Sequence, residues 1–236
     1  MKIIVLANNQ YKEKDAVVTA ISQSETITFL AKGLKDPKSK NSAINNTLTI
    51  SDIELMNGDY KFPILKSSKE LFTPLKVNMD SLYLGSLLLI NEIMLHFFSE
   101  EDKPKMFNYL EEGVIALKKS GNWLTVLLIF LARALCVGGF ELEVNRCVIC
   151  GQKNKIVAFS FLDGGFICQN CFNEEVEKDL TKEQMILLRA IFNSRDYHLV
   201  ESSLNKEDEL VLLRKFIQFS EDAFGYRLKN TRLILD

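Results

Sequence analysis

Apolar and polar residues alternate along the first third of the chain, and this period of two predicts β-strands. Polar stretches rich in Asn, Ser, Gly and Pro separate the alternating segments and are typical of turns. Five short strands within about 80 residues favour a small closed barrel, and the OB-fold is the main candidate. The expected strands are residues 2–7, 16–21, 26–32, 46–54 and 59–67, with a hairpin turn at Asn57-Gly58-Asp59.

From about residue 79 the apolar spacing changes to three and four residues, which predicts helices. Residues 123–137 are apolar almost all round and predict the central helix of a core. Thr181 and Gln184 have the spacing of a capping box, so a helix should begin between them. Further helices are expected at residues 82–98, after Pro104, and at about 206–224, where Gly225 would end the last one.

Two C-x-x-C pairs interrupt this helical region. Cys147 and Cys150 form the first pair, Cys168 and Cys171 form the second, and seventeen residues separate them. This spacing is typical of a four-cysteine zinc site, because each C-x-x-C turn supplies two adjacent corners of a tetrahedron. The β-rich residues 156–161 and the turn at 163–165 allow the chain to leave and return as a hairpin. With four cysteines no position stays open for water, so we expect a structural Zn²⁺ in a zinc-ribbon-like knuckle.

Other interpretations of the thiols are less well supported. Disulfides would require an oxidising compartment, and we find no secretory signal. Neither pair follows a strand and opens a helix, as the redox pair of thioredoxin-like proteins does. Cys136 lies in an apolar run and is expected to be a small buried side chain. We therefore favour metal binding over redox chemistry.

Composition limits the class of protein. The chain has 236 residues, 47% of them hydrophobic and 25% charged, with a formal net charge of -2 and a pI near 5.9. These values are typical of a folded globular protein and argue against a strongly basic nucleic-acid binder. The apolar runs 82–98 and 124–137 contain polar residues or are too short to span a bilayer. We expect a cytoplasmic protein without membrane contact.

One loop is rich in lysine. Residues 32–40, called the lysine loop below, carry Lys32, Lys35, Lys38 and Lys40, and Asp36 is the acid among them. These lysines have two interpretations, contact with phosphates or ordinary solvated surface charge. In the first case Tyr11 or Phe29 would offer a ring on which a base stacks.

Motifs of common enzymes are missing from the sequence. It contains no G-x-S-x-G, H-E-x-x-H, P-loop or G-x-G-x-x-G pattern. His96 falls on an apolar helix and His198 on an expected surface loop, so neither indicates a catalytic role. We expect a binding protein rather than an enzyme.

Taken in order, the segments resemble the bacterial RecO family of DNA repair and recombination mediators. The resemblance rests on the Tyr11–Asp15 turn, the Ala31–Lys40 loop, the two cysteine segments Gly139–Gly151 and Gly164–Cys171, and the tail Leu228–Leu235. It implies an α+β protein with an OB-fold at residues 1–78, a helical domain at 79–146 and 176–236, and the zinc knuckle inserted at 147–175.

The resemblance also implies a function. RecO-like proteins bind single- and double-stranded DNA, anneal complementary strands, and act with RecR to load RecA on strands coated with single-strand-binding protein. The resemblance implies that the lysine loop contacts DNA together with Tyr11 and Lys12. It also implies that the protein is located on the nucleoid. The loop differs from the family pattern, in which arginines are usual, so DNA binding should depend strongly on salt. An alternative is a zinc-stabilised protein–protein adaptor with little direct DNA binding.

Overall fold

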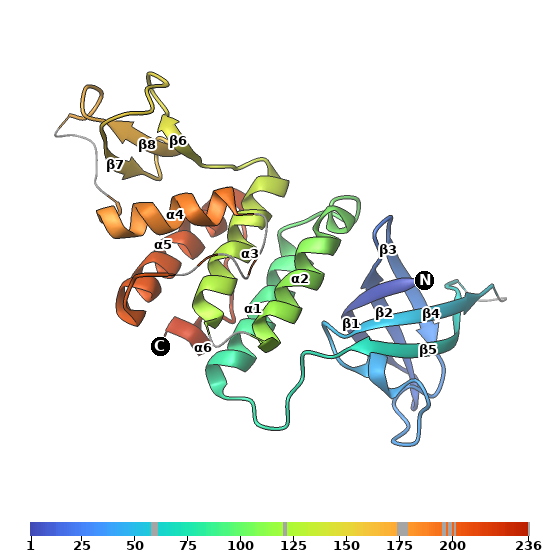
Figure 1. Cartoon of the computed structure of the whole chain (residues 1–236). Coiled ribbons are helices and arrows are strands. Elements are labelled where there is room, and N and C mark those ends of the chain that lie inside the picture. Colours follow the sequence, from blue (N-terminus) through green and yellow to red (C-terminus); the bar gives the residue numbers. More distant parts are fainter. Residues whose placement is uncertain are drawn as a thin grey trace. The chain divides into compact units, whose positions relative to one another are not determined.

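The computed structural model describes residues 1–57, 61–119, 122–173, 179–194, 197, 200 and 202–235. Most of the predicted turn Asn57–Asp59, the end of the second predicted helix at Ser120–Gly121, and His198 lie outside these residues. The chain forms two compact units, Met1–Lys119 and Ser120–Asp236, whose elements are labelled in Figure 1.

The first unit begins with a closed five-stranded barrel (Figure 1). The strand order around the barrel is β1-β2-β3-β5-β4, and β4 pairs with β1 to close it. The contact between β3 and β5 is parallel and all other pairs are antiparallel. This is the Greek-key barrel of the OB-fold, as predicted. The strands are β1 (Lys2–Tyr11), β2 (Asp15–Ile21), β3 (Thr26–Ala31), β4 (Ile50–Met56) and β5 (Ile64–Phe72).

The last two strands begin four or five residues later than the sequence pattern predicts. Before β4 the chain forms the short 3-10 helix η1 (Ser42–Asn45), and Leu48 has a left-handed φ of 61°. The segment therefore becomes extended only at Ile50. Before β5 stands Pro63, which has no N–H to donate to a neighbouring strand.

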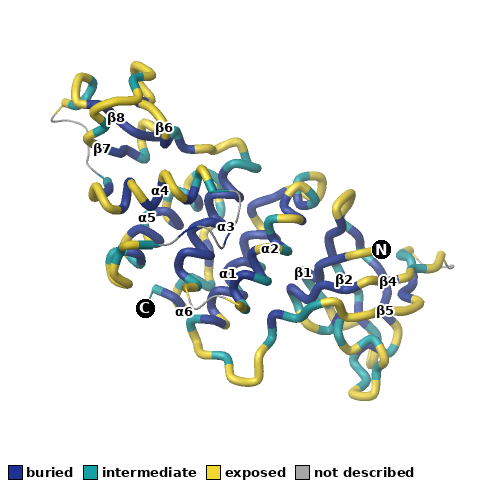
Figure 2. Tube along the Cα trace, viewed as in Figure 1, coloured by how far each residue is buried: buried dark blue, intermediate teal, exposed yellow. Residues whose placement is uncertain are grey.

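Alternation along the strands directs apolar side chains into the barrel. Its core includes Ile3 and Val5 of β1, Val18 of β2, Phe29 of β3 and Ile53 of β4. The buried trace follows these strands in Figure 2. Phe29 is 0% exposed, so the expectation that its ring could stack on a base was wrong. The same alternation contained this information, because Phe29 shares the apolar face of its strand with Ile27.

Two helices complete the first unit. Asp80 caps α1 (Ser81–His96), since its side chain accepts a hydrogen bond from the Tyr83 backbone N–H at 2.7 Å. The short η2 (Lys103–Met106) leads into α2 (Phe107–Lys119). Two hydrogen bonds join the barrel to this helical part. Thr26 Oγ1 donates to the carbonyl of Glu100 in the loop before η2 (2.7 Å), and Gln23 Nε2 donates to Asn108 Oδ1 on α2 (3.1 Å).

The second unit is built around α3 (Trp123–Gly138), whose apolar residues are buried on all sides as the sequence predicts. Gly139 ends this helix with a left-handed φ of 83°. Thr181 forms the predicted capping box with Gln184 at the start of α4. The remaining elements are β6 (Glu143–Cys147), β7 (Ile156–Ser160), β8 (Gly165–Cys168), α4 (Lys182–Asn193), α5 (Lys206–Phe224) and α6 (Arg232–Leu235).

The strands β6, β8 and β7 form a small sheet in that order. Strand β6 was not predicted, and it pairs with β8 in parallel through an irregular register. The fold is therefore α+β, with a barrel first and a helical region that carries the cysteines. Within the described residues, no helix combines the length and the apolar character needed to cross a membrane.

Candidate metal centre and nucleic-acid interface

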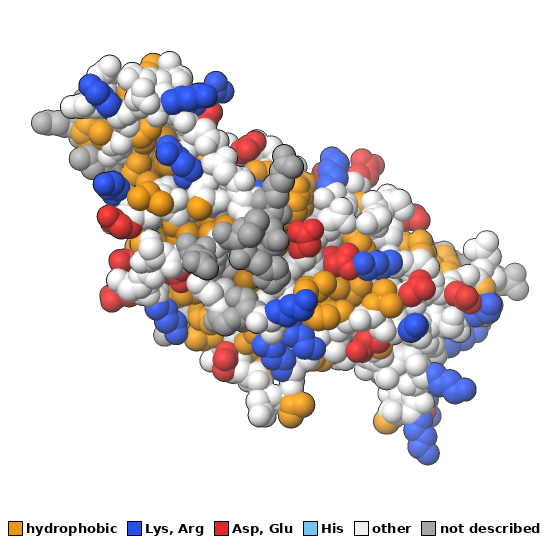
Figure 3. Space-filling model, viewed as in Figure 1, with side chains coloured by type: hydrophobic (Ala, Val, Ile, Leu, Met, Phe, Trp, Pro, Cys, Tyr) orange, Lys and Arg blue, Asp and Glu red, His pale blue; other side chains and the backbone are white. Residues whose placement is uncertain are grey.

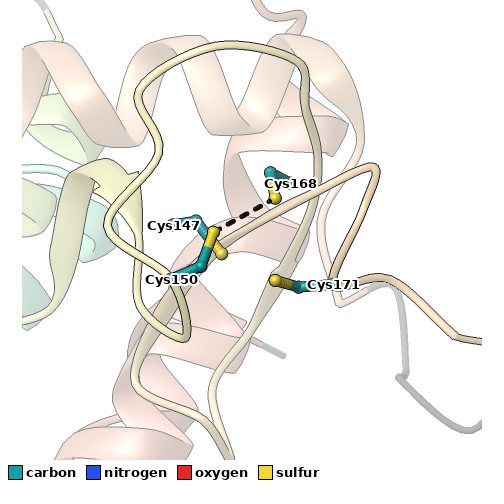
Figure 4. Close-up of side chains that lie close together, drawn as sticks. All are labelled: Cys147, Cys150, Cys168 and Cys171. Carbon is teal, nitrogen blue, oxygen red and sulfur yellow. Dashed lines mark hydrogen bonds between the residues drawn. The ribbon is translucent and has the colours of Figure 1, made fainter.

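The four cysteines meet at one point of the small sheet. The sulfur atoms of Cys147, Cys150, Cys168 and Cys171, called the cysteine cluster below, all lie within 4.8 Å of one another. Figure 4 shows the four side chains directed toward a common centre. The Sγ atoms of Cys150 and Cys168 are 3.6 Å apart. Since a tetrahedral zinc with Zn–S bonds of about 2.3 Å requires sulfurs about 3.8 Å apart, the cluster is compatible with a metal site.

Local backbone geometry creates this convergence. The first C-x-x-C turn closes through hydrogen bonds from Gly151 N to the Cys147 carbonyl and from Cys147 N to the Gln152 carbonyl, both 2.8 Å. Gly151 has a φ of 74°, which favours glycine. The second turn closes with Cys171 N donating to the Cys168 carbonyl at 3.0 Å. Both turns therefore present their thiols on the inside of a bend.

Without a cation, the pKa values of two thiols in the cluster are shifted in opposite directions. Burial raises the pKa of Cys147, yet hydrogen bonds from the backbone N–H groups of Cys168, Cys150 and Ile149 outweigh it and lower the pKa to about 6. Hydrogen bonds with Cys150 come first among the causes that raise the pKa of Cys171 to about 12. A bound divalent cation would lower the pKa of the cluster thiols, because it stabilises all four thiolates together.

The fifth cysteine stands apart from this site. Cys136 lies on α3 and is not a member of the cluster. Burial, with the negative charge of Glu141 as the next cause, raises its pKa to about 11. Cys136 is half-buried, so it is less enclosed than the sequence predicts.

The lysine loop is fastened to the turn between β1 and β2. Lys35 N donates to the Lys14 carbonyl at 2.9 Å and Gly33 N donates to Asp15 Oδ1 at 2.8 Å. Lys14 Nζ also pairs with Asp36 Oδ2 at 3.0 Å. The structure thus brings together two segments that the sequence pattern marks separately. The acid of the loop, Asp36, is paired with the ammonium group of Lys14.

The four loop lysines differ in their surroundings. Lys32, Lys38 and Lys40 are exposed, whereas Lys35 is half-buried. The ammonium group of Lys35 donates to Asn45 Oδ1 at 2.7 Å and to Asn8 Oδ1. Neither asparagine was predicted to contact the loop, because no periodic signal marks a side chain that approaches from 10 or 27 residues away.

The turn beside the loop carries an aromatic residue and a cation. Tyr11 is 44% exposed, and Lys12 Nζ lies 5.5 Å from the centre of its ring. Lys12 has a left-handed φ of 56°, an unusual conformation for a residue with a side chain. With Phe29 buried, Tyr11 is the candidate for base stacking whose ring remains accessible.

Comparison with protein families assigns the chain. The family model described as Recombination protein O N terminal matches residues 1–68, and that described as Recombination protein O C terminal matches residues 79–231. The second match alone covers more than half of the sequence. The chain belongs to the RecO family.

Individual RecO proteins are similar over most of their length. DNA repair protein RecO of Bacillus subtilis is 26% identical over 235 residues, which is 98% of this chain and 91% of the relative. That of Caldicellulosiruptor bescii is 26% identical over 219 residues, 90% of this chain and 89% of the relative. That of Bacillus pumilus is 29% identical over 178 residues, 74% and 69% of the two chains. The predicted family is confirmed for both parts of the chain. It is a family of DNA repair proteins.

Proposed function

We propose that this RecO protein is a recombination mediator that binds single- and double-stranded DNA and anneals complementary strands without catalysing a reaction. With RecR it would help load RecA on strands coated with single-strand-binding protein. Family membership supports the role, and the exposed lysines Lys32, Lys38 and Lys40 beside Tyr11 are the observation that supports direct DNA contact. This activity would take place in the cytoplasm, on the nucleoid.

The lysine loop suits strand annealing. Ammonium groups bind the phosphate backbone regardless of sequence, and an aromatic ring can hold one base by stacking. Neither contact occupies the pairing edge of a base. Two complementary strands held in this way can therefore find each other, and base pairing provides the specificity.

We propose that the cysteine cluster holds a structural Zn²⁺ through all four thiolates. The donor set is closed, so the metal would supply cross-linking of the two C-x-x-C turns rather than chemistry on a substrate. The small sheet needs such a link, because three short strands provide little core of their own. We assign three functional parts, namely the barrel at 1–78, the helical residues 79–146 and 176–236, and the knuckle at 147–175.

A salt titration of single-strand binding tests the DNA contact. We expect Lys38→Ala and Lys40→Ala each to reduce the slope of log affinity against log salt by about 0.7, the value for one phosphate contact on a single strand. Lys66→Ala is the matched control, because Lys66 is 62% exposed and pairs with Glu54 at 3.0 Å. Equal slopes for all variants would contradict the assignment of the loop.

A protein–protein adaptor is the second candidate. Val148 and Ile149 lie between the first two cysteines and are 38% and 58% exposed, which places an apolar tip on the surface. An adaptor would bind RecR or the tail of single-strand-binding protein tightly and keep its activity when the loop lysines are removed. Ile149→Ser, compared with the loop variants in the same loading assay, separates the two functions.

A further inference from the structure

A second group of lysines surrounds the connector between β5 and α1, residues 73–80. Both helices of the unit hold this connector, because Tyr83 Oη donates to the Pro74 carbonyl at 2.7 Å and Lys118 Nζ donates to the Thr73 carbonyl. Lys76 lies on the connector, and Lys119 follows Lys118 on the last turn of α2. Lys76 and Lys119 are exposed. Figure 3 shows basic side chains gathered over this region.

Aromatic rings fix two of these ammonium groups. Lys76 Nζ lies 4.1 Å from the ring centre of Tyr83, and Lys118 Nζ lies 5.1 Å from that of Phe72. A cation over a ring face is attracted by the electrons of that face and keeps its remaining N–H groups available. These lysines are therefore ordered before any ligand arrives, which lowers the entropy lost on binding.

Within the described residues of the first unit, no ion pair offsets the positive charge of this group. Residues three and four positions before Lys118 and Lys119 on α2 are apolar, so the helix offers them no acid. Asp80 is the acid closest in sequence to Lys76, and its carboxylate caps α1. The carboxyl end of α2 contributes only about half a negative charge. In the described part of this unit, other lysines do form ion pairs, namely Lys2, Lys14, Lys66, Lys103 and Lys105, whereas Lys76, Lys118 and Lys119 form none.

We propose that Lys76, Lys118 and Lys119 form a second binding site for the phosphate backbone of a nucleic-acid strand. The site differs in position from the lysine loop. Strand β5 begins beside the end of β3, where that loop starts, and it ends at the connector. Its nine residues span about 30 Å. The starting point of the lysine loop and the connector thus lie at opposite ends of one strand.

Two cationic sites on one unit give annealing a physical basis. Each site holds one strand by its phosphates, and both strands keep their bases free for pairing. This role rests on the proposed function, in which two strands are bound together. The existence of the second site does not depend on annealing and can be measured by itself.

Chemical footprinting measures occupancy directly. The native protein is acetylated with and without a 30-nucleotide strand, and the modification of each lysine is read by mass spectrometry. We expect DNA to protect Lys76 and Lys119 severalfold, while Lys66 and Lys105, which are paired with acids, change little. Unchanged acetylation of Lys76 and Lys119 would overturn the proposal. Protection by polyglutamate but not by DNA would assign the surface to an acidic protein and also overturn it.

A double variant tests what the site does. Lys76→Gln with Lys119→Gln leaves Lys118 in place, because Lys118 holds the connector. We expect the salt slope for binding a second strand to fall by about 1.4, the value for two phosphates of a single strand. Lys66→Gln with Lys105→Gln removes the same charge and should leave the slope unchanged.

The outcomes separate the two proposals. Protection of Lys76 and Lys119 in a protein that does not anneal strands would contradict the proposed function and support the second site. Annealing that proceeds equally fast in the double variant and in its control, with no protection of these lysines, would refute the second site and leave the proposed function standing.

Discussion

Lys35 Nζ donates a hydrogen bond to Asn45 Oδ1 at 2.7 Å, and this contact ties the lysine loop to the end of η1. The same ammonium group reaches Asn8 on β1, and Asn8 Nδ2 donates to the Asn45 carbonyl. The three side chains form one closed network. Lys35 therefore positions the loop, and the exposed lysines on either side of it face the solvent.

Removal of the asparagines tests this role without changing any charge. We expect Asn8→Ala or Asn45→Ala to weaken single-strand binding several-fold and to lower the free energy of unfolding by about 2 kcal/mol, because a hydrogen bond to a charged group is lost. Fluorescence anisotropy and urea titration give the two quantities. Asn9→Ala and Asn46→Ala, at exposed neighbouring positions, are the controls. Tighter DNA binding by Asn8→Ala would show instead that Lys35 itself contacts phosphate once it is released.

Loss of one cluster thiol should release the metal. We expect Cys147→Ser or Cys168→Ser to reduce bound zinc from about one per chain to near zero and to expose the small sheet to protease, because a three-ligand site cannot hold the two turns together. The barrel should remain folded, since it has its own buried core. Metal analysis and mapped proteolysis check both points. Cys136→Ala should keep its zinc, and zinc retained by Cys147→Ser would argue against a four-thiolate site.

Thiol reactivity should separate Cys136 from the cluster. With a pKa of about 11, only about one Cys136 side chain in a thousand is the reactive thiolate at pH 8. We expect its alkylation rate in the folded protein to rise about tenfold per pH unit up to about pH 11. Mass spectrometry of iodoacetamide-treated protein measures this rate. In urea the rate at pH 8 should rise sharply, because the thiol regains its ordinary pKa; rapid labelling of the folded protein at pH 7 would be inconsistent with burial.

Gly165 sets the distance between β6 and β8. A Cβ atom at this position would lie 2.5 Å from the Glu143 carbonyl oxygen and 2.9 Å from its Cβ. Because the first contact is with backbone, β6 would have to move, and Cys147 at its end would move with it. We expect Gly165→Ala to weaken zinc binding by tenfold or more in a chelator competition. Gly164→Ala is the control without a steric clash, because its added Cβ meets no atom within 4 Å. It tests the effect of backbone strain alone, since Gly164 has a φ of 78°.

The capping box of α4 should contribute measurably to stability. Thr181 Oγ1 accepts from Gln184 N at 3.2 Å, and Gln184 Oε1 accepts from Thr181 N at 3.0 Å. We expect Thr181→Ala to lower the free energy of unfolding by about 1 kcal/mol, since the Gln184 backbone N–H loses its partner. Thr181→Ser keeps the hydroxyl and should retain most of the stability. Urea unfolding followed by circular dichroism compares the two variants.

Features that depend on neighbouring residues were predictable from the sequence. The C-x-x-C spacing, the capping box at Thr181 and the apolar run of α3 each act within a few residues of chain, so their pattern reports the structure directly. The strand starts of β4 and β5 were less accurate, because a 3-10 helix and a proline shift them. Strand β6 was missed, since its short sequence carries no clear alternation.

One fact about the lysine loop required the folded chain. Lys35 and Lys38 are the same residue type in the same loop, yet only Lys35 meets Asn8 and Asn45. This difference cannot be read from composition or spacing. The burial of Phe29, by contrast, follows from the alternation along its strand, which places it on the apolar face with Ile27.

The sequence by itself determined the strands of the barrel, most of the helices and the four clustered thiols, because short-range periodicity and ligand spacing encode them. The tertiary structure decided which cations remain exposed, which one is held by asparagines, and where a second group of lysines gathers around the connector. These properties arise when segments distant in sequence pack together, and the physical reason is that burial and hydrogen bonding of a side chain depend on its neighbours in space.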